Sequence, residues 1–152
     1  MIKVNVEIQN KSWHKKIKNP KVYLNKRLKN ISEFIKLFEK KNVTFTILLT
    51  NSIRMKQLNK KFRNKNKPTD VLSFPYFLPK NLKSIKTKNI YLGDIAASYQ
   101  IINLRSKNSN FLLEFDKVWI HGLLHLVGYD HIKNKDHFKM RKVENNILGS
   151  IY

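Results

Sequence analysis

The chain has 152 residues, a length that suits one ordinary domain with its own hydrophobic core, and we expect residues 1–152 to form that single domain. It contains no cysteine, which excludes disulfides and thiolate metal sites and leaves His, Asp and Glu as metal ligands. The formal net charge of +21 favours nucleic acid or another polyanion as a partner. Codon drift explains the charge equally well, because alanine occurs only at Ala96 and Ala97 whereas Lys, Asn and Ile are abundant.

The first strand is expected over residues 2–8, where Ile2, Val4, Val6 and Ile8 alternate with polar residues. This period differs from that of an export signal, and no apolar run approaches the roughly 20 residues that cross a bilayer. We therefore expect a soluble, cytoplasmic protein with no membrane partner.

The remaining elements follow from apolar spacing and from turn residues along the chain. Helical spacing predicts an amphipathic helix over 21–40, and β-branched residues predict a strand over 43–50. A helix capped by Asn51 or Ser52 comes next, then a strand over 71–74 that ends at Pro75 and a basic loop over 76–90. The last elements are a strand over 91–97 and helices over 98–106, 111–127 and 134–148. Four strands mixed irregularly with helices indicate an α+β fold.

Three histidines near the C-terminus carry the clearest chemical signal. His121 and His125 lie four residues apart on one helix face, so both imidazoles can reach a single ion. Gly128 can reverse the chain, and His131 then returns to the same place. The pattern H-x-x-x-H-x-x-G-x-x-H is that of a large group of zinc peptidases, and three neutral imidazoles leave one zinc position open for water. The alternative, three hydrogen-bonded histidines at a helix end, is less consistent with this spacing.

The residue after the first histidine argues against a peptidase. Zinc peptidases have a glutamate there as general base, whereas this chain has Gly122. Without that carboxylate a peptidase lacks its usual means of deprotonating the water. Cleavage of a phosphodiester is less demanding, because a metal or cation can stabilise the departing alkoxide.

A second segment supplies cations suited to phosphate. Arg63 has a permanently charged guanidinium that can bind two phosphate oxygens, and Lys65 and Lys67 can hold flanking phosphates. The alternative is that these three residues are solvated charges after a helix.

Three motifs together resemble the YbeY family of endoribonucleases: LNKKFRNKNKPTDVLSFP at 58–75, LGDIAAS at 92–98 and HGLLHLVGYDH at 121–131. The likeness extends from the strand near Val43 to the last helix, where Met140, Glu144 and Leu148 fit the family's ending. It implies a small mixed four-stranded sheet packed with five or six helices and a zincin-like metal site. It also implies that His121, His125 and His131 bind one zinc ion and that Arg63 engages RNA phosphate.

The activity implied by the resemblance is single-strand-specific cleavage of RNA, in the maturation of small-subunit rRNA at its 3′ end and in ribosome quality control. The expected partners are rRNA, the small ribosomal subunit and assembly factors, and no DNA substrate is expected. A metal-dependent peptidase and an assembly factor with a structural zinc are the alternatives. Water and the RNA's 2′-hydroxyl both remain possible nucleophiles, and nickel or copper would also suit three imidazoles.

Other polar residues receive weaker predictions. Asp130 is expected either to orient a ligand imidazole, to accept a proton or to cap the turn after Gly128. Asp70 and Asp94 are expected to bind backbone at strand ends, and Ser73 to line the cleft. His14 and His137 lie outside the ligand spacing and are interpreted as ordinary surface residues.

Overall fold

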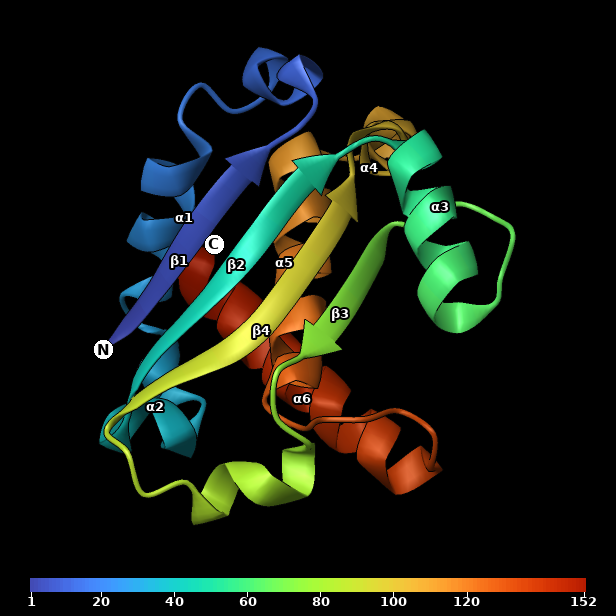
Figure 1. The fold of residues 1–152 in the computed structure, drawn as a ribbon. Helices are drawn as coiled ribbons and strands as arrows, with labels where there is room; N and C mark the ends of the chain where they lie inside the picture. Colours follow the sequence, from blue (N-terminus) through green and yellow to red (C-terminus); the bar gives the residue numbers. More distant parts are fainter.

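A four-stranded sheet forms the centre of the computed structural model, which describes residues 1–152 (Figure 1). Its strands are β1 (Ile2–Ile8), β2 (Asn42–Thr50), β3 (Val71–Pro75) and β4 (Asn89–Ser98), in the spatial order β1-β2-β4-β3. β1, β2 and β4 are parallel, whereas β3 pairs with β4 in the antiparallel sense. The prediction of a mixed four-stranded sheet in an α+β fold is confirmed.

Six α-helices surround the sheet, a number within the predicted range. They are α1 (Pro20–Leu28), α2 (Lys36–Lys40), α3 (Ser52–Arg63), α4 (Tyr99–Arg105), α5 (Phe111–Leu126) and α6 (Asn134–Ile151). Short 3₁₀ turns lie at Lys11–Lys15, Ile31–Glu33, Pro79–Ser84 and Ser106–Asn108. In Figure 1, α5 runs behind the sheet. None of the helices combines the length and the apolar composition needed to span a membrane.

The main core lies between the sheet and α5. Alternate residues of β2, Val43, Phe45, Ile47 and Leu49, are buried on the face that α5 covers, as the period of a strand requires. The opposite face of the sheet is covered in part by α3, whose Met55 is buried in a small cluster with residues of β3 and β4. The packing of α5 on the sheet therefore supports the side chains at the C-terminal end of α5.

The prediction of one helix over 21–40 is wrong. α1 ends at Leu28, a 3₁₀ turn follows, and α2 begins only at Lys36. Ile31, Ile35 and Phe38 are nevertheless buried, so the apolar spacing was a correct signal of burial. Burial of one face does not require an unbroken series of i to i+4 hydrogen bonds. The predicted loop over 76–90 likewise contains a 3₁₀ turn, which buries Leu82.

Gly93 allows β3 to approach β4 closely. Its φ of 130° is in the region that favours glycine, and a Cβ there would lie 2.2 Å from the carbonyl oxygen of Phe74. The β2–β4 register shifts between Thr44 and Thr46, which is the position of a β-bulge. The glycine of the LGDIAAS segment therefore fixes the path of β3, which forms one wall of the site described below.

A buried carboxylate anchors α5 to the rest of the molecule. Asp116 is fully buried and accepts hydrogen bonds from four donors. They are Tyr23 Oη (2.9 Å), Arg27 Nε (2.8 Å), Trp119 Nε1 (2.7 Å) and Tyr152 Oη (2.8 Å). Because these donors come from α1, α5 and the C-terminal residue, the network ties α1 and the end of the chain to the helix that carries His121 and His125.

Candidate metal centre and phosphate site

The three histidines come together at the C-terminal end of α5. His121 and His125 are one turn apart on the helix, and Gly128, with a φ of 98°, reverses the chain so that His131 returns to them. One ring nitrogen of each histidine lies within 4.8 Å of the other two. A Cβ at Gly128 would lie 2.9 Å from Pro79 Cβ, so glycine is also required by the packing of the turn.

Hydrogen bonds assign the free nitrogen of two of these rings. His125 Nδ1 lies 2.9 Å from the carbonyl oxygen of Tyr129, which can only accept, so Nδ1 carries the proton. His121 Nδ1 lies 2.6 Å from the Glu144 carboxylate and donates to it in the same way. Both Nε2 atoms therefore present lone pairs, and these two atoms are 3.0 Å apart. Two lone pairs at this distance repel each other unless a cation or a proton lies between them.

This arrangement fits a metal ion such as zinc. Zinc–nitrogen bonds of about 2.0–2.1 Å at tetrahedral angles place ligand nitrogens about 3.3 Å apart, close to the separation of the two Nε2 atoms. Burial, and the nearby His121, lower the pKa of His125 from its usual value. A lower pKa keeps this imidazole neutral near pH 7, which is the form that binds a metal.

Arg63 ends α3 beside the histidines. Asn64 has a left-handed φ of 55° and stops the helix there, and the Arg63 guanidinium lies 3.4 Å from the carbonyl oxygen of Ser73 on β3. Arg63 lines a hollow of about 700 Å³ that all three histidines also line. Lys65 and Lys67 line a neighbouring hollow of about 390 Å³, which contains Arg63 but none of the histidines.

The weaker predictions have mixed outcomes. Asp130 Oδ1 accepts the backbone N–H of His131, and Asp70 Oδ1 accepts that of Val71 while its other oxygen pairs with Arg105. Asp94 is exposed on β4 and accepts from the Tyr91 hydroxyl instead of from backbone. The expected backbone contact is thus found for Asp70 and is wrong for Asp94.

Ser73 lines the histidine hollow as expected, and its position explains Gly122. Its hydroxyl donates to the carbonyl oxygen of Gly122 over 3.0 Å. A Cβ at Gly122 would lie 3.0 Å from Ile95 Cγ2 and 3.2 Å from Ser73 Oγ. α5 therefore packs directly on β3 and β4 at this point, and the sheet fills the space that a glutamate side chain would need.

The place of two residues at the site was not predicted from the sequence. Glu144 orients His121, and His137, interpreted as an ordinary surface residue, is exposed but lies 6.5 Å from His131 between ring centroids. Both belong to the face of α6 that contains the buried Met140, three residues after His137 and four before Glu144. The sequence did contain one signal for Glu144, because a carboxylate on the buried face of a helix usually has a partner. His14 is exposed, and its ring lies 3.2 Å from the carbonyl oxygen of Lys18, as expected for a surface residue.

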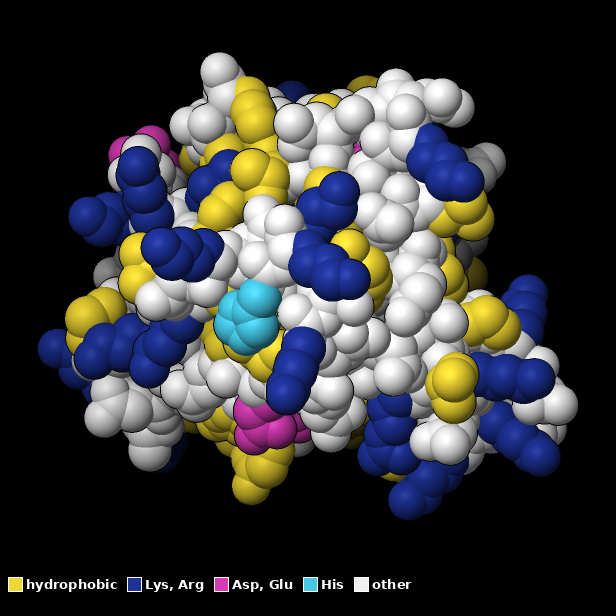
Figure 2. All heavy atoms as spheres, turned by 90° about the horizontal axis from the view of Figure 1, so that it is seen from above, with side chains coloured by type: hydrophobic (Ala, Val, Ile, Leu, Met, Phe, Trp, Pro, Cys, Tyr) yellow, Lys and Arg dark blue, Asp and Glu magenta, His cyan; other side chains and the backbone are white.

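Positive charge is spread over the molecular surface. Figure 2 shows Lys and Arg side chains at many separate points of one face, with acidic side chains at few. This distribution matches the excess of 31 Lys and Arg over 10 Asp and Glu. It creates a broad attraction for polyanions, which does not by itself identify a binding site.

Comparison with known proteins agrees with this site. The family model described as "Endoribonuclease YbeY" matches residues 7–152. A protein named Endoribonuclease YbeY from Pelagibacter ubique is 49% identical, and the alignment covers 99% of this chain and 97% of that protein. Proteins with the same name from Ehrlichia canis and Thermodesulfovibrio yellowstonii are each 34% identical over 99% of this chain, covering 93% and 99% of their own lengths.

The fold is also similar to a solved structure. The solution structure of TM1509 from Thermotoga maritima covers 99% of this chain and 91% of its own, with a TM-score of 0.54 and 26% identity. Family model, full-length relatives and the three-histidine centre agree with one another. The chain belongs to the YbeY family of endoribonucleases, enzymes that hydrolyse RNA.

Proposed function

We propose that this chain is a zinc-dependent, single-strand-specific endoribonuclease that matures the 3′ end of small-subunit rRNA and acts in ribosome quality control. Its partners would be the small ribosomal subunit and assembly factors, in the cytoplasm. Family membership supports the endoribonuclease activity. The observation that carries the proposal is that Arg63, whose guanidinium is suited to phosphate, lines the same hollow as three histidines suited to one metal ion.

The metal is proposed to be held by His121, His125 and His131. A zinc ion there would act as a Lewis acid toward a phosphate oxygen and would lower the pKa of water. Glu144 and the Tyr129 carbonyl hold two of the rings with Nε2 turned toward the common centre. The chain's own contribution to metal binding therefore includes two imidazoles whose tautomers are fixed in advance.

Arg63 is proposed to bind the phosphate that is cleaved. Its guanidinium donates to two oxygens at once and stays charged at every physiological pH. It therefore stabilises the negative charge that grows on the phosphate during cleavage. Lys65 and Lys67, in the adjoining hollow, hold neighbouring phosphates of the same strand.

The experiment is metal analysis of the purified protein beside cleavage of single-stranded RNA with and without a chelator. His125→Ala is expected to lose both metal and cleavage, whereas Arg63→Glu keeps the metal and loses cleavage. Arg54→Glu is the matched control, because Arg54 is exposed on the same helix and lines neither hollow. Normal cleavage by the Arg63→Glu protein would refute the phosphate-binding role.

The same samples separate the remaining alternatives. A cyclic phosphate at the 3′ end of the upstream product indicates attack by the 2′-hydroxyl, whereas a 3′-hydroxyl there with a 5′-phosphate on the downstream product indicates attack by water. Cleavage of an unfolded polypeptide would indicate a peptidase, which the absence of a glutamate at Gly122 disfavours. A purely structural metal predicts that His125→Ala unfolds, whereas a catalytic metal predicts a folded and inactive protein.

A further inference from the structure

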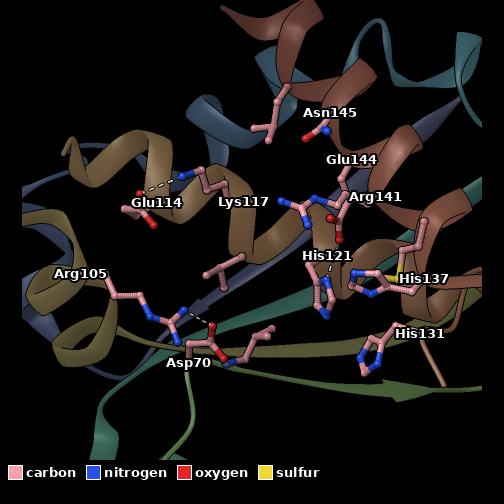
Figure 3. A pocket seen from close by; sticks show the side chains of 14 residues that line it. Asp70, Arg105, Glu114, Lys117, His121, His131, His137, Arg141, Glu144 and Asn145 are labelled. Atoms are coloured by element: carbon pink, nitrogen blue, oxygen red, sulfur yellow. Dashed lines mark hydrogen bonds and ion pairs between the residues drawn. The ribbon is translucent and has the colours of Figure 1, made fainter. Parts of the chain in front are cut away.

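A groove between α5 and α6 meets the histidine centre without including Arg63 in its lining. It has a volume of about 490 Å³ and is drawn in Figure 3. The groove and the hollow that contains Arg63 have four lining residues in common: Asp70, Val71, His121 and His131. The histidine centre is therefore at a junction, with one depression leading away toward α3 and another leading away between α5 and α6.

An endoribonuclease needs room on both sides of the phosphate that it cleaves. Its substrate continues in the 5′ and in the 3′ direction, so nucleotides leave the metal centre along two paths. Arg63, Lys65 and Lys67 line the hollows beside the groove and not the groove itself. The groove between α5 and α6 is the other depression that reaches the histidines.

One cation in this groove has no partner. Arg105 pairs with Asp70, and Lys117 pairs with Glu114 over 3.0 Å. Arg141, which is exposed on α6, makes no ion pair and no hydrogen bond. The third carboxylate of the groove, Glu144, is engaged by His121. Figure 3 shows Arg141 extending from α6 into the space above His121. Among the Lys and Arg side chains of the groove, the Arg141 guanidinium is thus the one free to bind an anion.

The walls of the groove suit a nucleotide. Val71 and Leu148 line the groove and are only partly buried, so they provide it with an apolar surface. The exposed ring of His137 stands beside His131 at the end nearest the metal centre. Imidazole rings are among the side chains on which unpaired RNA bases stack. The groove therefore offers a flat ring for a base, an apolar surface for a sugar and a free guanidinium for a phosphate.

We propose that the groove between α5 and α6 binds the RNA strand on the side of the cleaved phosphate away from Arg63, with Arg141 as its phosphate contact and His137 as a base contact. This inference rests on the proposed function, since it assigns a further part of the same substrate. Arg141 is a substrate-binding residue and takes no part in holding the metal.

The test compares Arg141→Ala with Lys142→Ala. Lys142 is the next residue of α6, is exposed and does not line the groove. Lys142→Ala therefore removes the same charge as Arg141→Ala, at a neighbouring position outside the groove. Binding of a fluorescent single-stranded RNA to chelator-treated protein is measured by anisotropy over a range of salt concentrations. Arg141→Ala is expected to bind about tenfold more weakly, with a salt slope reduced by about 0.7, the value for one lost phosphate contact on a single strand. Lys142→Ala is expected to bind like the unaltered protein.

Trimming the RNA gives a second readout. With the metal-loaded enzyme, removing nucleotides from one end of the substrate should lower kcat/KM, and on the trimmed RNA Arg141→Ala and unaltered enzyme should be equal. If unaltered protein cleaves RNA but Arg141→Ala and Lys142→Ala have the same affinity and salt slope, the groove assignment is wrong and the proposed function stands. If the unaltered protein neither binds nor cleaves RNA, the proposed function fails, and the groove assignment fails with it.

Discussion

Replacing Glu144 by glutamine tests how the structure prepares His121 to bind a metal. The Glu144 carboxylate lies 2.6 Å from His121 Nδ1, and its side chain is only 22% exposed, so water replaces the contact poorly. Hydrogen bonds to charged groups contribute about 1.5–3 kcal/mol and neutral ones about 0.5–1.5 kcal/mol. Glutamine keeps the shape and one acceptor but loses the charge, so its hydrogen bond to His121 is weaker by about 1.3 kcal/mol, which corresponds to roughly tenfold in zinc affinity.

The expected result is therefore a graded loss of zinc affinity. Glu144→Gln should bind zinc about tenfold more weakly, and Glu144→Ala up to about 100-fold more weakly, because alanine leaves the His121 ring free to rotate. Affinity is measured by competition with a chromophoric chelator near neutral pH, and melting temperatures of the metal-free proteins show whether folding is intact. Asn146→Ala is the control, since Asn146 is exposed on α6 and lines no part of the groove. Unchanged affinity in folded Glu144→Ala would refute the orienting role.

Two further predictions concern the buried network around Asp116. Asp116→Ala should lower the free energy of unfolding, measured by urea denaturation, by about 3–5 kcal/mol, because Arg27 and three other donors lose their carboxylate. Tyr152→Phe removes only one of these donors and should lower the free energy of unfolding by about 1 kcal/mol. Burial and the neighbouring Asp116 raise the pKa of Tyr23 well above its usual value. Tyr23 loses its proton near pH 10 in the unfolded chain but keeps it in the folded protein. The contribution of Tyr23 to the free energy of unfolding is therefore fully present below about pH 10 and falls as the pH rises further. Tyr23→Phe should flatten that alkaline decline in urea midpoints.

Much of the site could be predicted because its spacing is local. His121 and His125 are one helical turn apart whatever the rest of the fold does, and Gly128 marks the reversal before His131. The limits of β1 were also predictable, because the alternation of apolar and polar residues follows from the pleat itself. Such features depend on a few neighbouring residues, so the sequence contains them directly.

The partners of these residues depend on how helices cross, which the sequence does not show. Glu144 reaches His121 across 23 positions of the chain only because α6 packs against α5 at that point. His137 enters the groove for the same reason, although its distance from the three-histidine motif made it look unrelated. The error over residues 21–40 has another cause, since the apolar period continued through a 3₁₀ turn that interrupts the helix.

Gly122 shows why the chemical interpretation of a missing residue needs the structure. Gly122→Glu would restore the glutamate of zinc peptidases, but its Cβ would lie 3.0 Å from Ile95 Cγ2, and Ile95 is fully buried. Overpacking at such a position costs about 1–3 kcal/mol, and burial of a carboxylate with few donors adds to that. We therefore expect Gly122→Glu to be strongly destabilised in urea and to cleave no peptide.

Gly122→Ala is the control for this substitution, because it adds the close Cβ without the charge and gains about 1 kcal/mol of helix propensity. Its stability should remain close to that of the unaltered protein if Ile95 shifts by a few tenths of an ångström. A Gly122→Glu protein of full stability that hydrolyses a peptide would show that the sheet leaves room for a general base. The expected failure would instead show that packing of α5 on β3 and β4 excludes that base, so that catalysis in this chain depends on groups around the hollow and not on the helix position after His121.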